Sequence, residues 1–266
     1  MAKTVFIDFD GTLAYHAVVP AAHLEAVRQA RQAGHRVFLC TGRPKVLIPD
    51  RFRTDHFDGM ICASGAYVEV DGDVLTDVRF PAELAATTAS VLMEHDATFI
   101  LEAPDRIYTT PAALERLRSL YDLMKATGVE NLRVDPLPES LGHCSFAVAA
   151  VMASPVALTD IADLLGPEIA AVSLAVFGGG GYSGDLHLSD VDKAIGMAAI
   201  EKHLGLDRAD FIGIGDDVND LAMLNYAATS VVVEGGPEEV LATAHHIIPG
   251  PASDGLVHAF TELGLT

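Results

Sequence analysis

The sequence predicts an α/β protein in which a Rossmann-like core with a parallel sheet is interrupted by an inserted α+β domain. Short apolar runs that end in small polar residues alternate with helical patterns in the first third of the chain, and the same alternation returns near its end. The segment between them has a different rhythm, with longer helical stretches and isolated strand-like runs. At 266 residues, half of them hydrophobic, the chain is long enough for a folded core with a smaller insert.

The first part of the chain reads as strand, helix, strand and strand. Residues 4–7 are a β-branched and aromatic run that leads straight into polar residues, as expected of a buried strand that ends in a functional loop. Apolar residues recur at helical spacing over 24–30, and Gly34 closes that helix. Residues 36–39 and 59–62 are two further strands with small polar residues after them. Right-handed crossovers in such a pattern give a parallel sheet whose ligand site lies beyond the carboxyl ends of the strands, so these loops should converge.

The later part of the chain repeats this pattern, with strands predicted at 210–214 and 230–233. Helical and strand-like segments alternate differently in the insert. The helical segments are 81–95 and 112–125, and the strand-like ones are 98–101, 146–151 and 172–177. We therefore expect a core of residues 1–80 and 185–266 and an inserted domain of residues 81–184, with boundaries near Phe80 and Gly184.

Composition limits the kinds of partner. The chain carries 37 acidic and 17 basic residues, a formal net charge of −20, and a field of that sign repels nucleic acid and anionic membranes. Cys40, Cys62 and Cys144 are too few and too scattered for a disulfide framework. The N-terminus does not resemble a signal peptide, and no apolar stretch is long enough to span a bilayer. We expect a soluble cytoplasmic protein.

Two acidic loops are the main chemical signal. Asp8 and Asp10 follow the first strand, and Asp216, Asp217 and Asp220 follow a later one. Two acids beside a glycine are common in turns, but opposed acidic loops would repel each other unless a cation neutralised them. Mg²⁺ prefers such oxygen ligands. Asp216 is the expected direct ligand, whereas Asp220 lies one helical turn later and either binds the ion or supports the site around it.

Three other polar residues indicate a functional site only if they lie beside a bound anion. Lys193 precedes a helical segment, and Thr41 and Ser64 follow two of the predicted strands. Most single lysines are solvated surface groups, and strand-end hydroxyls are common. At the carboxyl edge of a parallel sheet, however, hydroxyl and backbone N–H groups can hold phosphate oxygens.

Four segments resemble, in order, the motifs of the haloacid dehalogenase-like (HAD) hydrolase superfamily. They are residues 8–13 (DFDGTL), 41–43 (TGR), Lys193 and 215–220 (GDDVND). The position of the insert, between the second and third motifs, resembles the Cof-type branch of subfamily IIB, which carries a large α+β cap. Residues 254–257 (DGLV) resemble that branch as well.

The resemblance implies a Mg²⁺-dependent phosphomonoesterase that acts on a small phosphorylated metabolite, with a sugar phosphate favoured, through a phospho-aspartate on Asp8. Asp10 would be the general acid and base, with Thr41 and Lys193 as further catalytic residues. The implied phosphate contacts are Asp8, Gly11, Thr41, Gly42, Lys193 and Asn219. The implied metal ligands are Asp8, Asp10, Asp216 and Asp220.

Several alternatives remain open on the sequence. A phospho-aspartate signalling or binding module shares the acidic pocket, the Thr and the Lys, although such modules are about half this length. A sugar phosphomutase of the same superfamily shares the core and a similar cap. Pyridoxal phosphate, nucleotides and flavin mononucleotide follow sugar phosphates as candidate substrates, and the oligomeric state, monomer or dimer, is open. The glycine run 178–181 is either a hinge for cap closure or an idle loop.

Overall fold

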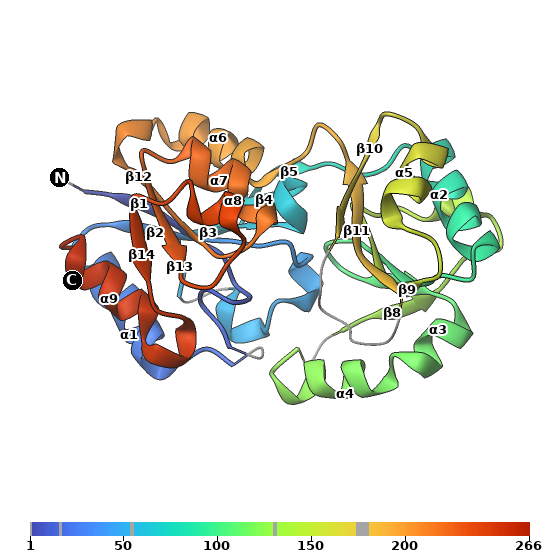
Figure 1. Cartoon of the computed structure of the whole chain (residues 1–266), viewed down its shortest axis with the longest axis horizontal. Helices are drawn as coiled ribbons and strands as arrows, with labels where there is room; N and C mark the ends of the chain where they lie inside the picture. Colours follow the sequence, from blue (N-terminus) through green and yellow to red (C-terminus); the bar gives the residue numbers. More distant parts are fainter. Residues whose placement is uncertain (1, 16–17, 54–55, 130–131, 174–180) are drawn as a thin grey trace. The chain divides into compact units, whose positions relative to one another are not determined.

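The computed structural model describes residues 2–15, 18–53, 56–129, 132–173 and 181–266, and its chain divides into two compact units (Figure 1). The core unit consists of Met1–Arg43, Asp50–Asp77 and Asp192–Thr266. The cap unit consists of Pro44–Pro49 and Val78–Val191. Among the described residues, no helix is both long enough and apolar enough to cross a membrane.

The core unit is built on an eight-stranded sheet in the order β14-β13-β12-β1-β2-β3-β4-β5. Its strands are β1 Thr4–Ile7, β2 Arg36–Cys40, β3 Gly59–Cys62, β4 Tyr67–Val70, β5 Asp73–Asp77, β12 Phe211–Gly215, β13 Thr229–Val233 and β14 His246–Ile248. The pairs from β14 to β3 are parallel, and β4 and β5 add an antiparallel hairpin at one edge. This sheet confirms the predicted α/β class with a parallel core.

Helices cover both faces of the core sheet. They are α1 Ala21–Gln32, α6 Lys193–Leu204, α7 Leu221–Tyr226, α8 Glu238–Leu241 and α9 Gly255–Glu262. α6 and α7 pack together on one face, and α1 packs with α9 on the other (Figure 1). Inside, Phe6 of β1 stacks on Phe38 of β2 with ring centroids 5.3 Å apart, and both are wholly buried. Buried aromatic rings on neighbouring strands thus fix the centre of the sheet whose edge carries the site.

The cap unit contains a six-stranded sheet in the order β10-β11-β9-β6-β7-β8. Its strands are β6 Thr98–Glu102, β7 Ile107–Thr109, β8 Val134–Pro136, β9 Val148–Ser154, β10 Ile169–Ser173 and β11 Tyr182–Leu188. All pairs are antiparallel except β7 with β8. Its helices are α2 Ala82–Glu94, α3 Pro111–Arg116, α4 Arg118–Ala126 and α5 Leu158–Leu165.

Alternate residues of the cap strands pack into two separate apolar clusters. Phe99 and Leu101 of β6 pack in a cluster with residues of α2 and α5. Ile100, which points to the opposite face, packs in a second cluster that includes Tyr121 of α4. Val46 from the Pro44–Pro49 segment belongs to this second cluster, which explains why that short segment joins the cap unit.

The structure departs from the expected elements in three places. Gly184, near the expected second boundary, lies inside β11, which pairs with β9 and β10, and the cap unit extends to Val191. The helix expected over 112–125 is divided between α3 and α4 at Leu117, whose backbone (φ −94°, ψ 7°) leaves the helical region. The strand expected at 172–177 lies partly outside the described residues, as do residues 178–180 of the glycine run.

Short 3₁₀ turns complete the description. They are Lys45–Leu47, Asp50–Phe52, Ala63–Gly65, Leu141–His143, Arg208–Asp210, Val218–Asp220 and Pro251–Ser253. Two of them, Ala63–Gly65 after β3 and Val218–Asp220 after β12, lie in loops that the sequence predicts to carry the site. The carboxyl ends of β1, β2, β3 and β12 lie at one edge of the core sheet, since these strands run parallel.

Candidate active site

The loop after β1 is a compact turn that fixes Asp8. The N–H of Asp8 donates to the carbonyl of Ile214 in the neighbouring strand, at 2.9 Å. The carbonyl of Asp8 accepts a hydrogen bond from the N–H of Leu13 at 3.2 Å, which closes the turn. Gly11 in this turn has φ +88°, and a Cβ there would lie 2.2 Å from Oδ2 of Asp216, so only glycine fits. The N–H of Gly11 donates to the carbonyl of Ala14 at 3.0 Å.

Lys193 is a buried cation held between two carboxylates. Its Nζ donates to Oδ1 of Asp8 at 2.6 Å and to Oδ1 of Asp220 at 2.5 Å, and its side chain is 0% exposed. Asp192 caps the helix that starts at Lys193 by accepting from the N–H of Ile195 at 2.9 Å. Burial lowers the pKa of Lys193, but Asp220 and Asp8 outweigh it and the net pKa is raised. Lys193 is therefore charged at every ordinary pH.

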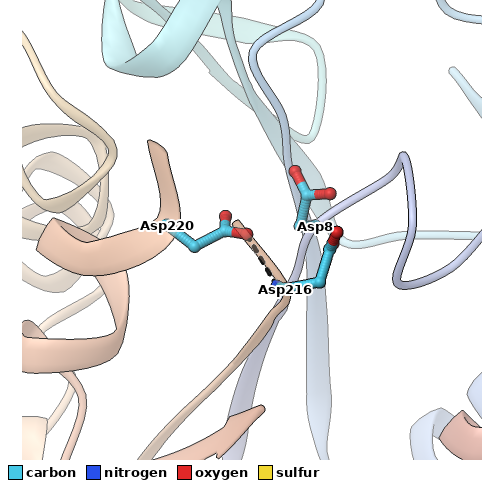
Figure 2. Close-up of side chains that lie close together, drawn as sticks. All are labelled: Asp8, Asp216 and Asp220. Carbon is cyan, nitrogen blue, oxygen red and sulfur yellow. Dashed lines mark hydrogen bonds between the residues drawn. The ribbon is translucent and has the colours of Figure 1, made fainter. Parts of the chain in front are cut away.

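Three carboxylates form a cluster beside this lysine. One oxygen from each of Asp8, Asp216 and Asp220 lies within 4.8 Å of the others, and Figure 2 shows the three side chains together. Burial raises the pKa of Asp8 well above its ordinary value and raises the pKa of Asp216 to about 7, with the charge of Asp220 adding to both shifts. A hard cation with oxygen ligands would relieve this repulsion, so the donor set fits Mg²⁺.

The members of the cluster differ in how many of their oxygens are already used. Oδ2 of Asp220 accepts from the backbone N–H groups of Asp216 at 2.9 Å and Asp217 at 3.2 Å (Figure 2 draws the first), while its Oδ1 accepts from Lys193. Asp216 accepts from Thr12 Oγ1 at 2.6 Å through Oδ1 alone. Both oxygens of Asp220 are thus engaged with protein donors, whereas Asp8 and Asp216 have more capacity for an ion.

The side chain of Asp10 pairs with an arginine and not with the residues of this cluster. Its side chain is 50% exposed and forms a two-pronged ion pair with Arg43, with Nε to Oδ2 at 2.5 Å and Nη2 to Oδ1 at 2.6 Å. The Arg43 guanidinium also lies over the ring of Phe9, 4.8 Å from its centroid. Arg43 was not among the residues given a role from the sequence, although it stands in the TGR motif.

The remaining candidate residues meet at the ends of β2, β3 and β12. The carbonyl of Thr41, which is 1% exposed, accepts from the N–H of Ser64 at 3.1 Å, and its Oγ1 accepts from the N–H of Arg43 at 3.1 Å. A Cβ on Gly42 would lie 3.4 Å from Nδ2 of Asn219 and 3.5 Å from Oγ of Ser64. The loops therefore converge as the parallel sheet predicts.

The loop after β3 has an unusual backbone that the sequence did not indicate. Ala63, Ser64 and Gly65 have φ of 50°, 52° and 108°, which places three successive residues in the left-handed region. A Cβ on Gly65 would lie 1.9 Å from the carbonyl oxygen of Asp192, so this glycine allows the start of α6 to approach the loop. Such strain is concentrated at functional sites, and here it adjoins the residue that precedes Lys193.

Comparison with known proteins agrees with this geometry. A family profile described as haloacid dehalogenase-like hydrolase matches residues 5–260. YkrA of Bacillus subtilis, named as a phosphatase, is 23% identical over 99% of this chain and 98% of its own length. The HAD subclass IIB sugar phosphatase BT4131 has a fold that superposes with a TM-score of 0.83 at 22% identity, covering 100% of both chains. A HAD/COF-like hydrolase from Plasmodium vivax has a TM-score of 0.85 at 20% identity, over 99% of this chain and 95% of its own.

These matches confirm the predicted superfamily and the predicted class of enzyme, a phosphatase. The family profile spans nearly the whole chain, including the cap unit. With its motifs gathered at one edge of the core sheet, the chain belongs to the haloacid dehalogenase-like hydrolases.

Proposed function

We propose that the protein is a Mg²⁺-dependent phosphomonoesterase of the Cof type that works through a phospho-aspartate on Asp8. The observation that carries this proposal is the buried Lys193, which donates to Asp8 and Asp220 beside the carboxylate of Asp216. A carboxylate that attacks a phosphate dianion meets like-charge repulsion, so a nucleophilic aspartate needs a fixed cation beside it. Lys193 supplies one such cation.

Asp8 and Asp216 are the residues best suited to hold Mg²⁺ directly, with the backbone carbonyl of Asp10 as a third ligand. When bound, the ion would supply positive charge against the phosphate oxygens. Asp220 was predicted as a ligand too, but its hydrogen bonds to Lys193 and to two backbone N–H groups favour a supporting role, in which it fixes the lysine and the loop after β12.

The chemistry assigned to the chain's own residues has two steps. In the first, an Asp8 oxygen attacks phosphorus, the ester bond breaks, and Asp10 gives its proton to the departing alkoxide. In the second, Asp10 takes a proton from water, the resulting hydroxide attacks the phosphorus of the phospho-aspartate, and phosphate leaves with Asp8 regenerated. Thr41 and Asn219, together with the backbone near Gly42, would hold the phosphoryl oxygens, and Arg43 would keep Asp10 oriented between the steps.

The proposed substrate is a small phosphorylated metabolite, with sugar phosphates first. Support for this order comes from the fold shared with the subclass IIB sugar phosphatase, and the net charge of −20 makes nucleic acid a poor partner. A phosphomutase of the same superfamily is the alternative. Measuring free phosphate against isomerised product from a hexose phosphate separates the two, because only hydrolysis releases phosphate.

The test of the nucleophile is Asp8→Asn, assayed for phosphate release from a panel of phosphorylated metabolites with Mg²⁺. We expect no turnover, because the amide cannot attack phosphorus. Asp210→Asn is the matched control, since Asp210 is a partly exposed aspartate that pairs with Lys3 on the core unit, and it should keep wild-type activity. A tenth or more of wild-type activity in Asp8→Asn would contradict the assignment.

A further inference from the structure

His23 is one of the buried titratable side chains of the core unit to which the mechanism above gives no role. The residue lies on the first turn of α1 and is 0% exposed. Its Nδ1 lies 3.0 Å from the carbonyl oxygen of Leu13, and its Nε2 lies 3.4 Å from the backbone nitrogen of Leu256. A carbonyl can only accept and a backbone N–H can only donate, so the imidazole is neutral, with its proton on Nδ1. Burial lowers the pKa of His23, which agrees with that form.

On one side, His23 contacts the segment 254–257 that stood out in the sequence. The first turn of α9 has backbone N–H groups without partners inside the helix. Those of Val257 and His258 donate to the carbonyl of Asp254, and that of Leu256 donates to His23. Asp254 has φ +56°, and a Cβ on Gly255 would lie 1.8 Å from the carbonyl oxygen of Pro249. The helix start is therefore closely packed, and it holds the imidazole in place.

On the other side, His23 contacts the turn that carries the proposed nucleophile. Leu13 accepts from His23 through its carbonyl and donates through its N–H to the carbonyl of Asp8, at 3.2 Å. Thr12, the neighbour of Leu13, donates to Asp216. A hydrogen-bonded chain thus runs from Leu256 through His23 and Leu13 to the backbone of Asp8.

We propose that His23 is a positioning residue for catalysis, which holds the turn after β1 so that Asp8 and Thr12 keep their places beside Lys193 and Asp216. The inference rests on the proposed role of Asp8 as nucleophile. An apolar side chain of similar size would fill the same space but leave the Leu13 carbonyl and the Leu256 N–H without their partner. The turn could then move, and small displacements of a reacting group lower the rate strongly.

Three substitutions separate the two ends of the imidazole. In His23→Asn the side-chain amide nitrogen lies near the place of Nδ1 and can still donate to Leu13. In His23→Gln the amide reaches the place of Nε2 and can accept from Leu256, but Leu13 loses its donor. His23→Leu removes both bonds. Val27→Ala is the matched control, because Val27 is a wholly buried residue of the same helix and its truncation weakens the packing alone.

The measurement is kcat and KM with p-nitrophenyl phosphate and Mg²⁺, at a temperature where circular dichroism shows each variant folded. We expect His23→Asn to keep kcat within about threefold of wild type, and His23→Gln and His23→Leu to lose about tenfold in kcat with little change in KM. Val27→Ala should lower the melting temperature and leave kcat unchanged. If His23→Leu does not fold, the inference is tested by comparing kcat of His23→Gln with kcat of His23→Asn.

Wild-type kcat in folded His23→Gln and His23→Leu would overturn the inference, as would a loss of kcat in Val27→Ala equal to theirs. Asp8→Asn in the same assay separates this failure from that of the proposed function. An inactive Asp8→Asn beside fully active His23 variants overturns only the positioning role, whereas an active Asp8→Asn removes the nucleophile on which that role depends.

Discussion

Replacing Lys193 with methionine should destabilise the core unit far more than the loss of any surface lysine. Its ammonium lies 2.6 Å from Asp8 and 2.5 Å from Asp220, with no exposed surface. At an effective dielectric constant of about 20, each contact contributes roughly 6 kcal/mol of attraction, and most of this is offset by the desolvation of the buried charges. Methionine fills the space but leaves two buried carboxylates without a counter-charge, which costs about 3–5 kcal/mol.

The assay is urea denaturation of the wild type and variants in EDTA at neutral pH, so that no divalent ion replaces the missing charge. Lys3→Met is the control, because Lys3 also lies 2.6 Å from an aspartate, Asp210, but the two side chains are 37% and 30% exposed. Its loss should cost less than about 1 kcal/mol. Adding Asp220→Asn to Lys193→Met should recover part of the stability. A cost for Lys193→Met no larger than that for Lys3→Met would refute the reasoning.

Three further predictions concern the metal, a cap carboxyl and the acid/base residue. Mg²⁺ should restore the activity that EDTA removes, and Ca²⁺ should restore much less because it favours a looser geometry. Mg²⁺ should also raise the melting temperature of the wild type but not that of Asp216→Asn. Burial raises the pKa of Asp185 to about 7, so the folded state keeps a proton that the unfolded chain loses above pH 4, and stability falls as pH rises from about 4 to 7. Asp185→Asn should therefore stabilise the protein by about 2 kcal/mol at pH 8 and by less at pH 5, as measured by thermal melts. The figure is smaller than the full pKa shift would give, because the residue is only half-buried and water screens its charge. Arg43→Ala should lower kcat about tenfold by releasing Asp10 and change stability by less than about 1 kcal/mol, and an unchanged kcat would remove the orienting role.

The core of the fold could be predicted because its signals are local. Strands such as β1 and β3 are short apolar runs bounded by polar loops, and a parallel arrangement brings their ends to one edge. The prediction that Asp8 and Asp216 meet combined that geometry with the repulsion between two acidic loops, which a cation would neutralise. The contact of Lys193 with Asp8 came from the resemblance, because nothing local distinguishes a lysine that will be wholly buried from one on a surface.

The parts that could not be predicted depend on distant partners. His23 looks like any polar residue of an amphipathic helix, and its bond to Leu256 joins positions that are 233 residues apart. The hairpin of β4 and β5 has a local signal in the sequence, the dipeptide Asp71-Gly72, which favours the two-residue hairpin turn. Both residues have the positive φ that this turn requires.

The Pro44–Pro49 segment has a practical consequence for any attempt to separate the two units. A fragment in which residues 78–191 are replaced by a short linker keeps Val46 and Leu47, which are 3% and 4% exposed among cap residues in the whole chain. Without their partners these side chains would face water at a cost of roughly 1.5–3 kcal/mol each. They would do so only three and four residues after Arg43 of the second motif. A minimal core enzyme therefore needs polar residues at these two positions, and an excised cap needs an apolar substitute for them.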